Sequence, residues 1–158
     1  MNTKYHQLGF SLIELLLVVA IIGIISAIAV PNLLASKRAA NEGSALSSVR
    51  TITSAQATYQ ATTGAGSYGS LANLHTAGLV DSALSGSTLL TPKSGYFFSA
   101  AADATTPNSQ YLTTATTSQP NGVTASGTRN FASDATGLVT QSAASTTPMT
   151  SNNGTPIN

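Results

Sequence analysis

The chain has 158 residues, of which 7% are charged, a formal net charge of +1 and no cysteine. This length leaves room for one ordinary domain and an anchoring segment. The scarcity of charge excludes a basic face for nucleic acid, so no direct nucleic-acid site is evident, and the lack of cysteine excludes disulfides and zinc–thiolate sites. A small domain without disulfides must be stabilised by its own core or by neighbours in an assembly.

The N-terminal segment contains the most unusual feature of the chain. After a short polar start with Lys4 and His6, residues 10–30 are apolar apart from Glu14, and the apolar run closes on Pro31. About 20 such residues are enough to span a bilayer as a helix. A carboxylate inside a segment of this kind is costly unless a group outside the segment neutralises it. Glu14 is therefore predicted to be functional.

A secretory signal peptide is the alternative interpretation of this segment. Residues 27–29, Ala-Ile-Ala, could serve as its small-residue cleavage site. The length of the apolar run, the presence of Glu14 and the continuation of the helical pattern all argue against it. The charge rule for topology does not settle orientation, because Lys4 precedes the run while Lys37 and Arg38 follow it. Export of the remaining chain is inferred from its neutral, hydroxyl-rich composition.

Beyond Pro31 the chain becomes amphipathic. Apolar residues recur at steps of three and four, which predicts one buried helix face made of Ala45, Leu46, Val49, Ile52, Ala55 and Tyr59. Charged residues, Glu42 and Arg50 among them, occupy other positions. If the two halves are continuous, one helix of about fifty residues runs from residue 10 to about residue 61. Such a helix is far longer than the rest of the chain can bury.

Two residues weaken this predicted helix. Pro31 cannot donate a backbone hydrogen bond and disfavours helical geometry in the residue before it, while Gly23 costs about 1 kcal/mol relative to alanine. The segment between them is therefore predicted to kink or melt. In lipid, the freed backbone groups would need neighbours or a polar side chain such as Ser26.

The long helix is predicted to end at residues 64–69, Gly-Ala-Gly-Ser-Tyr-Gly. These letters match G-x-G-x-x-G, but a dinucleotide fingerprint follows a strand and opens a helix, whereas this stretch closes one. We interpret it as a loop. Residues 70–79 predict a short helix with Leu71 and Leu74 facing inward, and residues 81–90 predict a loop or helical turn.

From residue 96 onward, the spacing between apolar residues shortens to the alternation that is typical of strands. Four strands separated by turn residues are predicted, at residues 96–101, 110–116, 128–133 and 138–142. Their short connections permit only antiparallel pairing. The predicted fold class is therefore α+β, with a long N-terminal helix packed on a small four-stranded antiparallel sheet. The remaining residues, 143–158, are rich in Ser, Thr and Asn and predict a loosely ordered tail unless a neighbour holds it.

Residues 9–14, Gly-Phe-Ser-Leu-Ile-Glu, followed by the apolar run and Pro31, resemble the class III signal of type IV prepilins. That family includes major and minor pilins and the pseudopilins of type II secretion. The resemblance implies a type IV pilin-like fold. It also implies five segments: a cleaved leader (1–9), the membrane or filament-core half of the helix (10–31), its amphipathic half (32–63), a globular αβ-loop and sheet (64–142), and a flexible tail (143–158).

The resemblance also implies specific roles for five residues. Prepilin peptidase would cut between Gly9 and Phe10 and methylate the new amino group of Phe10. Glu14 would pair with the Phe10 ammonium of an adjoining subunit, which agrees with the cost of a buried unpaired carboxylate. The segment between Gly23 and Pro31 would be the helix break that opens when the subunit leaves the bilayer for the filament.

The implied function is that of a structural subunit of a type IV pilus-like extracellular filament that supports adhesion or motility. Such a subunit is stored in the inner membrane as a single-pass protein and ends in a filament on the cell surface. The implied partners are other copies of the chain, prepilin peptidase, an inner-membrane assembly platform with its ATPase, and the lipid bilayer before assembly. The alternative is a pseudopilin or minor pilin of a type II secretion or DNA-uptake machine.

A membrane-anchored enzyme or binding domain is the third possibility, and the residues argue against it. After the apolar run, His75 is the only histidine, and no Ser, His and acid spacing suggests a catalytic triad. His75 has no second histidine beside it to share a metal. Asp103 and Asp134 are too few to compose a calcium site. We therefore expect no enzymatic activity, no cofactor and no metal.

Overall fold

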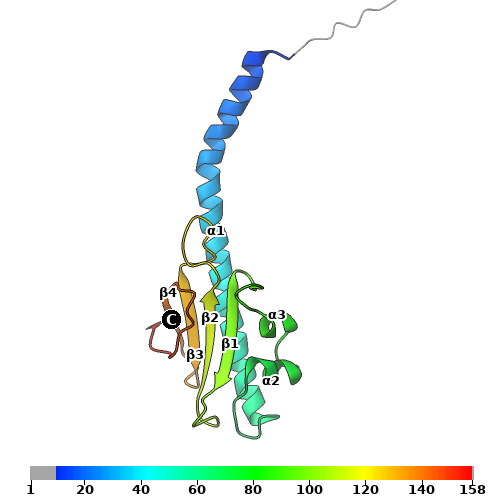
Figure 1. The fold of residues 1–158 in the computed structure, drawn as a ribbon, viewed down its shortest axis with the longest axis vertical. Coiled ribbons are helices and arrows are strands. Elements are labelled where there is room, and N and C mark those ends of the chain that lie inside the picture. Colours follow the sequence, from blue (N-terminus) through cyan, green and yellow to red (C-terminus); the bar gives the residue numbers. More distant parts are fainter. Residues whose placement is uncertain (1–9, 158) are drawn as a thin grey trace, which may run out of the picture. The chain divides into compact units, whose positions relative to one another are not determined.

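The computed structural model describes residues 10–157. The chain divides into two compact units, Met1–Ala35 and Ser36–Asn158, and residues 36–157 are called the head below. The elements, in chain order (Figure 1), are helices α1 (Leu12–Ala61), α2 (Leu71–Thr76) and α3 (Ser82–Ser85), and strands β1 (Tyr96–Ala102), β2 (Tyr111–Thr117), β3 (Arg129–Asp134), β4 (Val139–Ala143) and β5 (Thr155–Pro156). The fold class is α+β, as the sequence predicts.

Helix α1 is a single helix of 50 residues that continues through both Gly23 and Pro31. It begins after Ser11, whose carbonyl oxygen accepts the amide of Leu15 at 3.2 Å. Its ends match the predicted limits of the long helix, near residues 10 and 61. The helix break at Gly23 and Pro31 stays a prediction, because it concerns the passage of the subunit into a filament.

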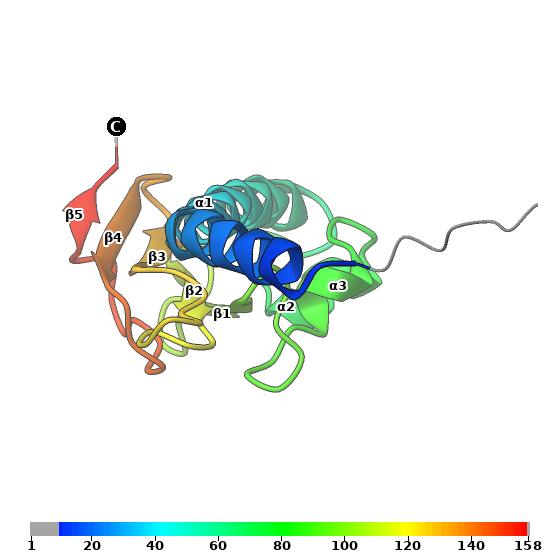
Figure 2. The same ribbon diagram turned by 90° about the horizontal axis from the view of Figure 1, so that it is seen from above.

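The sheet is an antiparallel meander in the order β1-β2-β3-β4-β5. Phe98 of β1 stands opposite Ala115 of β2, which stands opposite Phe131 of β3. In Figure 2 the head portion of α1 crosses one face of the sheet, α2 and α3 lie towards the β1 edge, and β5 lies at the other edge. Every pair of neighbouring strands is antiparallel, which confirms the pairing expected from the lengths of the connections.

The predicted count of four strands is one too few, because the C-terminal segment adds β5 beside β4. Gln141 of β4 pairs with Thr155 of β5. Earlier in the same segment, the carbonyl oxygen of Ser145 accepts hydrogen bonds from Asn130 Nδ2 at 2.9 Å and Thr117 Oγ1 at 3.2 Å. A two-residue strand has no readable period, and its proline is tolerated only because it lies at the sheet edge.

The core of the head lies between α1 and the sheet. The buried apolar residues of α1 are Ala45, Val49, Ile52 and Ala55, with Leu46 and Tyr59 partly buried beside them. They pack with residues of the sheet, including Tyr96, Phe98, Ala115, Phe131 and Val139. The predicted buried face of α1 is therefore confirmed, as are the inward positions of Leu71 and Leu74. Glu42, which the sequence pattern left among the polar positions, is buried on this face instead.

The glycine-rich loop that follows α1 is shaped by the ring of Tyr59. A Cβ atom would lie 2.7 Å from ring carbons of Tyr59 if placed on Gly64, and 2.8 Å from the ring if placed on Gly69. The buried side chain of Gln56 holds the loop, since its Nε2 donates to the Gly69 carbonyl at 2.6 Å and its Oε1 accepts the Gly69 amide at 3.0 Å. The two outer glycines of G-x-G-x-x-G thus have a packing reason and need no phosphate.

We expect the substitution Gly69→Ala to lower the free energy of unfolding of the head by about 1–3 kcal/mol, because the new methyl group overlaps Tyr59. Urea unfolding of the full-length chain in detergent micelles, followed by tyrosine fluorescence, measures this change. Gly43→Ala is the control: a Cβ there meets nothing within 4 Å, so this helical site should gain about 0.5–1 kcal/mol. A Gly69→Ala protein as stable as the wild type would contradict the packing.

Candidate functional site

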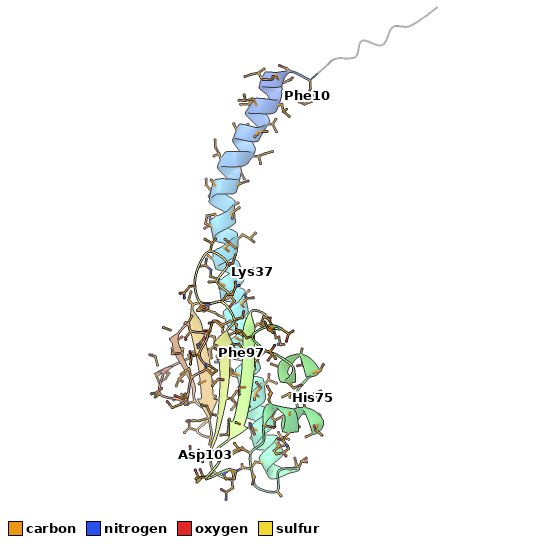
Figure 3. All side chains as sticks on the ribbon, in the orientation of Figure 1. Phe10, Lys37, His75, Phe97 and Asp103 are labelled. Carbon is orange, nitrogen blue, oxygen red and sulfur yellow. The ribbon has the colours of Figure 1, made fainter. Side chains whose placement is uncertain are left out.

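Residues 10–35 present an uncovered apolar surface. The large apolar side chains from Phe10 to Leu33 are exposed, Phe10 at 82%, and Figure 3 shows side chains projecting from this part of the helix on all sides. Within residues 10–157, α1 is the one helix long and apolar enough to cross a membrane, and none of its apolar window is buried. A surface of this extent must be covered by lipid or by other protein chains.

Glu14 lies in the first turn of α1 and is exposed. Its Oε2 accepts the backbone amide of Ser11 at 3.1 Å. This bond forms half of a capping box, and the carboxylate faces the positive end of the helix dipole. The structure therefore gives Glu14 a local partner, which fits the S-x-x-E spacing of residues 11–14. Gly9 lies outside the described residues, so cleavage after Gly9 and methylation of Phe10 stay predictions.

The backbone around Pro31 is helical but lacks one hydrogen bond. Proline has no amide to donate, so the carbonyl of Ala27 has no intrahelical donor. One residue further on, Asn32 Nδ2 donates to the Ile28 carbonyl at 3.0 Å. A Cβ on Gly23 would meet nothing within 4 Å, so packing among the described residues does not require glycine there. Both weak points of α1 are thus properties of the backbone itself.

An ion pair between the buried Glu42 and the half-exposed Arg129 joins α1 to the sheet within the head. Glu42, only 7% exposed, accepts the Thr128 amide at 2.6 Å and the Thr128 hydroxyl at 2.7 Å through Oε1. Its Oε2 accepts Nε and Nη2 of Arg129 at 2.9 and 2.6 Å. Arg129 also donates to Gln141 Oε1 at 2.6 Å, which extends the network to β4. Charge-assisted bonds of this geometry are among the strongest in proteins.

The network sets the protonation of its members. Burial raises the pKa of Glu42, but the hydrogen bonds from Thr128 and Arg129 outweigh it and leave this pKa below its usual value. Burial also raises the pKa of Tyr96, and the nearby charge of Glu42 adds to the effect. The Tyr96 hydroxyl stays protonated and donates to the Arg129 carbonyl at 2.7 Å. Sequence reasoning missed this network; the only available signal was that Glu42 is the sole glutamate after Glu14.

The other candidate residues have local structural roles. His75 Nδ1 lies 3.0 Å from the Val80 carbonyl oxygen. Asp103 Oδ1 accepts hydrogen bonds from amides and hydroxyls of the turn that follows β1. Asp134 Oδ1 accepts the amide and hydroxyl of Thr136 in the turn between β3 and β4. No group of three or more His, Cys, Asp or Glu side chains that could hold a metal ion occurs among residues 10–157.

Comparison with known proteins bears on the N-terminal region. Residues 4–30 match the prokaryotic N-terminal methylation motif. The type IV wide pilus major component PilA4 of Thermus thermophilus is 59% identical over 34 residues, 22% of this chain and 26% of that protein. The type II secretion system core protein G of Pectobacterium carotovorum is 36% identical over 59 residues, 37% of this chain and 38% of that protein. The chain thus spans well under half the length of either relative, and no solved structure matches it.

The uncovered N-terminal helix lies in a segment similar to those of a pilus component and a secretion-system core protein, which supports a pilin-like structural subunit. More specifically, the chain carries a prepilin-type N-terminal methylation motif and is homologous in this region to a type IV pilin and a type II secretion pseudopilin. The resemblance inferred from residues 9–14 and the following apolar run is therefore confirmed. Pilins and pseudopilins are structural proteins, in agreement with the expectation that the chain is not an enzyme.

The Glu42–Arg129 pair makes the stability of the head depend on pH. Because the pKa of Glu42 is lower in the folded state than in the unfolded state, its contribution is present above about pH 4.5 and is lost as the pH falls through the folded-state pKa. We expect Glu42→Gln to lower the free energy of unfolding by about 1–2 kcal/mol at pH 7, since Arg129 loses its anion but, with its side chain 46% exposed, stays in contact with water. This difference should shrink below about pH 4.

Urea unfolding of the full-length chain in detergent micelles at several pH values measures this difference. The control is Arg50→Gln, which removes an exposed charge of α1 outside the network and should change stability by less than about 0.5 kcal/mol at every pH. If the Glu42→Gln difference stayed constant from pH 7 to pH 3, the carboxylate would not be the stabilising species.

Proposed function

We propose that the chain is a pilin, the structural subunit of a type IV pilus-like filament that supports adhesion or motility. The observation that carries this proposal is the wholly exposed apolar helix of residues 10–31, in a segment homologous to those of a pilus component and a pseudopilin. In the inner membrane this helix spans the bilayer as a single pass. In the filament, the same surface is covered by the helices of other copies.

In this proposal, processing prepares the chain for assembly. Prepilin peptidase removes residues 1–9 and methylates the amino group of Phe10. An assembly platform with its ATPase then moves the subunit out of the bilayer. Energy input is needed because lipid and filament core are both apolar, so transfer of the helix gains little hydrophobic free energy. Packing and specific pairing between helices must then decide where each subunit stops.

Glu14 is the residue proposed to provide that pairing. Within residues 10–36 there is no Lys, Arg or His, so the amino group of Phe10 is the only cation that processing leaves near the head of the helix. A carboxylate in an apolar helix bundle requires such a partner. The amide of Ser11 satisfies one oxygen of Glu14 in the single chain but does not neutralise its charge.

A second candidate function is that of a pseudopilin or minor pilin in a type II secretion or DNA-uptake machine. It is favoured by the match to the type II secretion core protein G, which reaches further along the chain than the match to the pilus component. The two functions differ in what the cell loses without the chain. Loss of long surface fibres indicates a pilin, whereas loss of secreted protein or of DNA uptake with no fibres in the wild type indicates the alternative.

The substitution Glu14→Gln separates charge pairing from helix capping. Glutamine can still accept the Ser11 amide, as it does in capping boxes, but it carries no charge. We expect the variant to insert and be processed normally, yet to yield at least about tenfold fewer filaments, which corresponds to roughly 1.4 kcal/mol per subunit contact. Electron microscopy of sheared surface material counts the filaments. Mass spectrometry of wild-type filaments should find a subunit that begins at N-methylated Phe10.

Glu14→Asp is the matched variant, since it keeps the charge and should assemble better than Glu14→Gln. Normal filament numbers from Glu14→Gln would exclude the proposed pairing. A mature chain that begins at Val30, after the alternative cleavage site at residues 27–29, would instead exclude prepilin processing altogether.

We further propose that the segment from Gly23 to Pro31 loses helix in the filament. In wild-type filaments, the amides of this segment should exchange with solvent deuterium faster than in the micelle-bound subunit, because Pro31 and Gly23 weaken the helix there. Replacing both residues with alanine restores the missing donor and should reduce this difference and the filament yield several-fold. Equal protection of the segment in both states would contradict the proposal.

A further inference from the structure

Two basic and two acidic side chains of the head lie at its opposite ends. Lys37 and Arg38 lie near one end, where Arg38 Nη2 donates to the carbonyl of Val123 in the β2–β3 loop at 3.1 Å. At the other end, Gln60 Nε2 donates to the Asn108 carbonyl in the β1–β2 connection at 2.7 Å. The 23 helical steps between Lys37 and Gln60 span about 35 Å. Figure 3 shows Lys37 and Asp103 at these opposite ends.

The end far from Lys37 is acidic. Asp103 directly follows β1, and Asp134 ends β3. The two lie on turns at the same end of the strands, since Ala102 of β1 stands opposite Tyr111 and Asp134 stands opposite the next residue, Leu112. The Thr105 hydroxyl, with the amides of Thr106 and Thr105, lowers the pKa of Asp103 to about 2. Among residues 10–157, the hydrogen bonds that these two carboxylates accept all reach their Oδ1 atoms. Asp103 is exposed and Asp134 is partly exposed.

The acidic end is also hollowed. A surface depression of about 450 Å³ is lined by Asp103 and Asp134 together with residues of β1, β2 and the C-terminal segment, among them Asn152. The basic end instead carries the β2–β3 loop, whose Val123 is 69% exposed. Within residues 10–157 the one salt bridge is that of Glu42 with Arg129, so no internal ion pair neutralises either end.

We propose that these two ends dock onto each other in successive copies of the chain, so that heads stack end to end along the filament. The inference rests on the proposed filament function. Lys37 and Arg38 of one copy face Asp103 and Asp134 of the next, and the Val123 loop meets the acidic hollow. Opposite surfaces on opposite ends form a heterologous interface, which repeats along a fibre and need not close into a ring. Exposed ion pairs are individually weak, so their main effect is to fix register and to disfavour the reversed orientation.

Cross-linking of filaments tests this docking directly, because the chain has no natural cysteine. The full-length chain with Ser36→Cys and Ala104→Cys keeps all four charges and carries one thiol at each end. Within one copy these positions lie at opposite ends of the head, which the length of α1 places about 35 Å apart, beyond the reach of a short bismaleimide. Treated filaments should give a ladder of dimers, trimers and longer products on denaturing gels. Either single-cysteine variant should give none beyond dimers.

The control for geometry is Ser36→Cys with Leu90→Cys. Leu90 is 91% exposed but lies in the loop before β1, outside the acidic end. This pair should give no ladder. The control for charge compares two variants. One carries both Asp103→Asn and Asp134→Asn, and the other carries Asp81→Asn alone. Asparagine keeps the turn-capping Oδ1 in all of them, and Asp81 caps α3 in the same way through the Leu84 amide.

The double asparagine variant should lose subunits from filaments about two- to fivefold faster and give a correspondingly weaker ladder, whereas Asp81→Asn should behave as the wild type. Filaments that give no ladder, or an equal ladder from the Ser36 and Leu90 pair, overturn the docking and leave the filament function standing. A wild type that makes no filaments contradicts the proposed function instead. If Lys37→Gln lowers only the amount of membrane-inserted subunit and leaves the ladder unchanged, the basic end serves lipid headgroups and the docking is wrong.

Discussion

The structure depends on one constraint: the N-terminal half of α1 is apolar on every side, and nothing among the described residues of the chain covers it. Such a helix is stable only where another molecule replaces water around it. A bilayer and a bundle of like helices both meet that need. In the proposed function, the same surface would serve a stored subunit and an assembled one, and the difference between these states would come from a few polar groups.

Glu14 is the main polar group in that half, and its geometry has two consequences. Its bond to the Ser11 amide stabilises the start of α1 in a single copy. The charge that remains is tolerable beside water or lipid headgroups but costly inside a helix bundle, unless a cation is supplied. The proposed cation, the amino group of Phe10, exists only after the leader is removed. Processing and assembly would thus be linked through a single electrostatic requirement.

The head shows how a chain with so little charge uses the charge it has. Glu42 and Arg129, far apart in the sequence, form an ion pair in which two guanidinium nitrogens donate to Oε2 of the carboxylate, and this pair ties the buried face of α1 to β3. Gln56 plays a similar part for the loop after α1 through its bonds to Gly69. These buried polar contacts supplement a small apolar core that has no disulfide to support it. Four of the other charges, those of Lys37, Arg38, Asp103 and Asp134, lie at the two ends of the head.

The sequence by itself determined the long helix, its apolar and amphipathic halves, the antiparallel sheet and the prepilin motif. These features follow from local period, from short connections and from one compact run of residues, so they can be read without knowing which distant residues meet. Only the tertiary structure decided that Glu42 is buried, that it pairs with Arg129, and that the C-terminal segment adds a fifth strand. Each of these depends on a contact between residues distant in sequence or on a strand of two residues, and neither leaves a periodic signal. Tyr59 is the intermediate case: its place on the buried helix face was predictable, but its contact with Gly64 and Gly69 was not, because a glycine required by packing looks the same in a sequence as a glycine required by a turn.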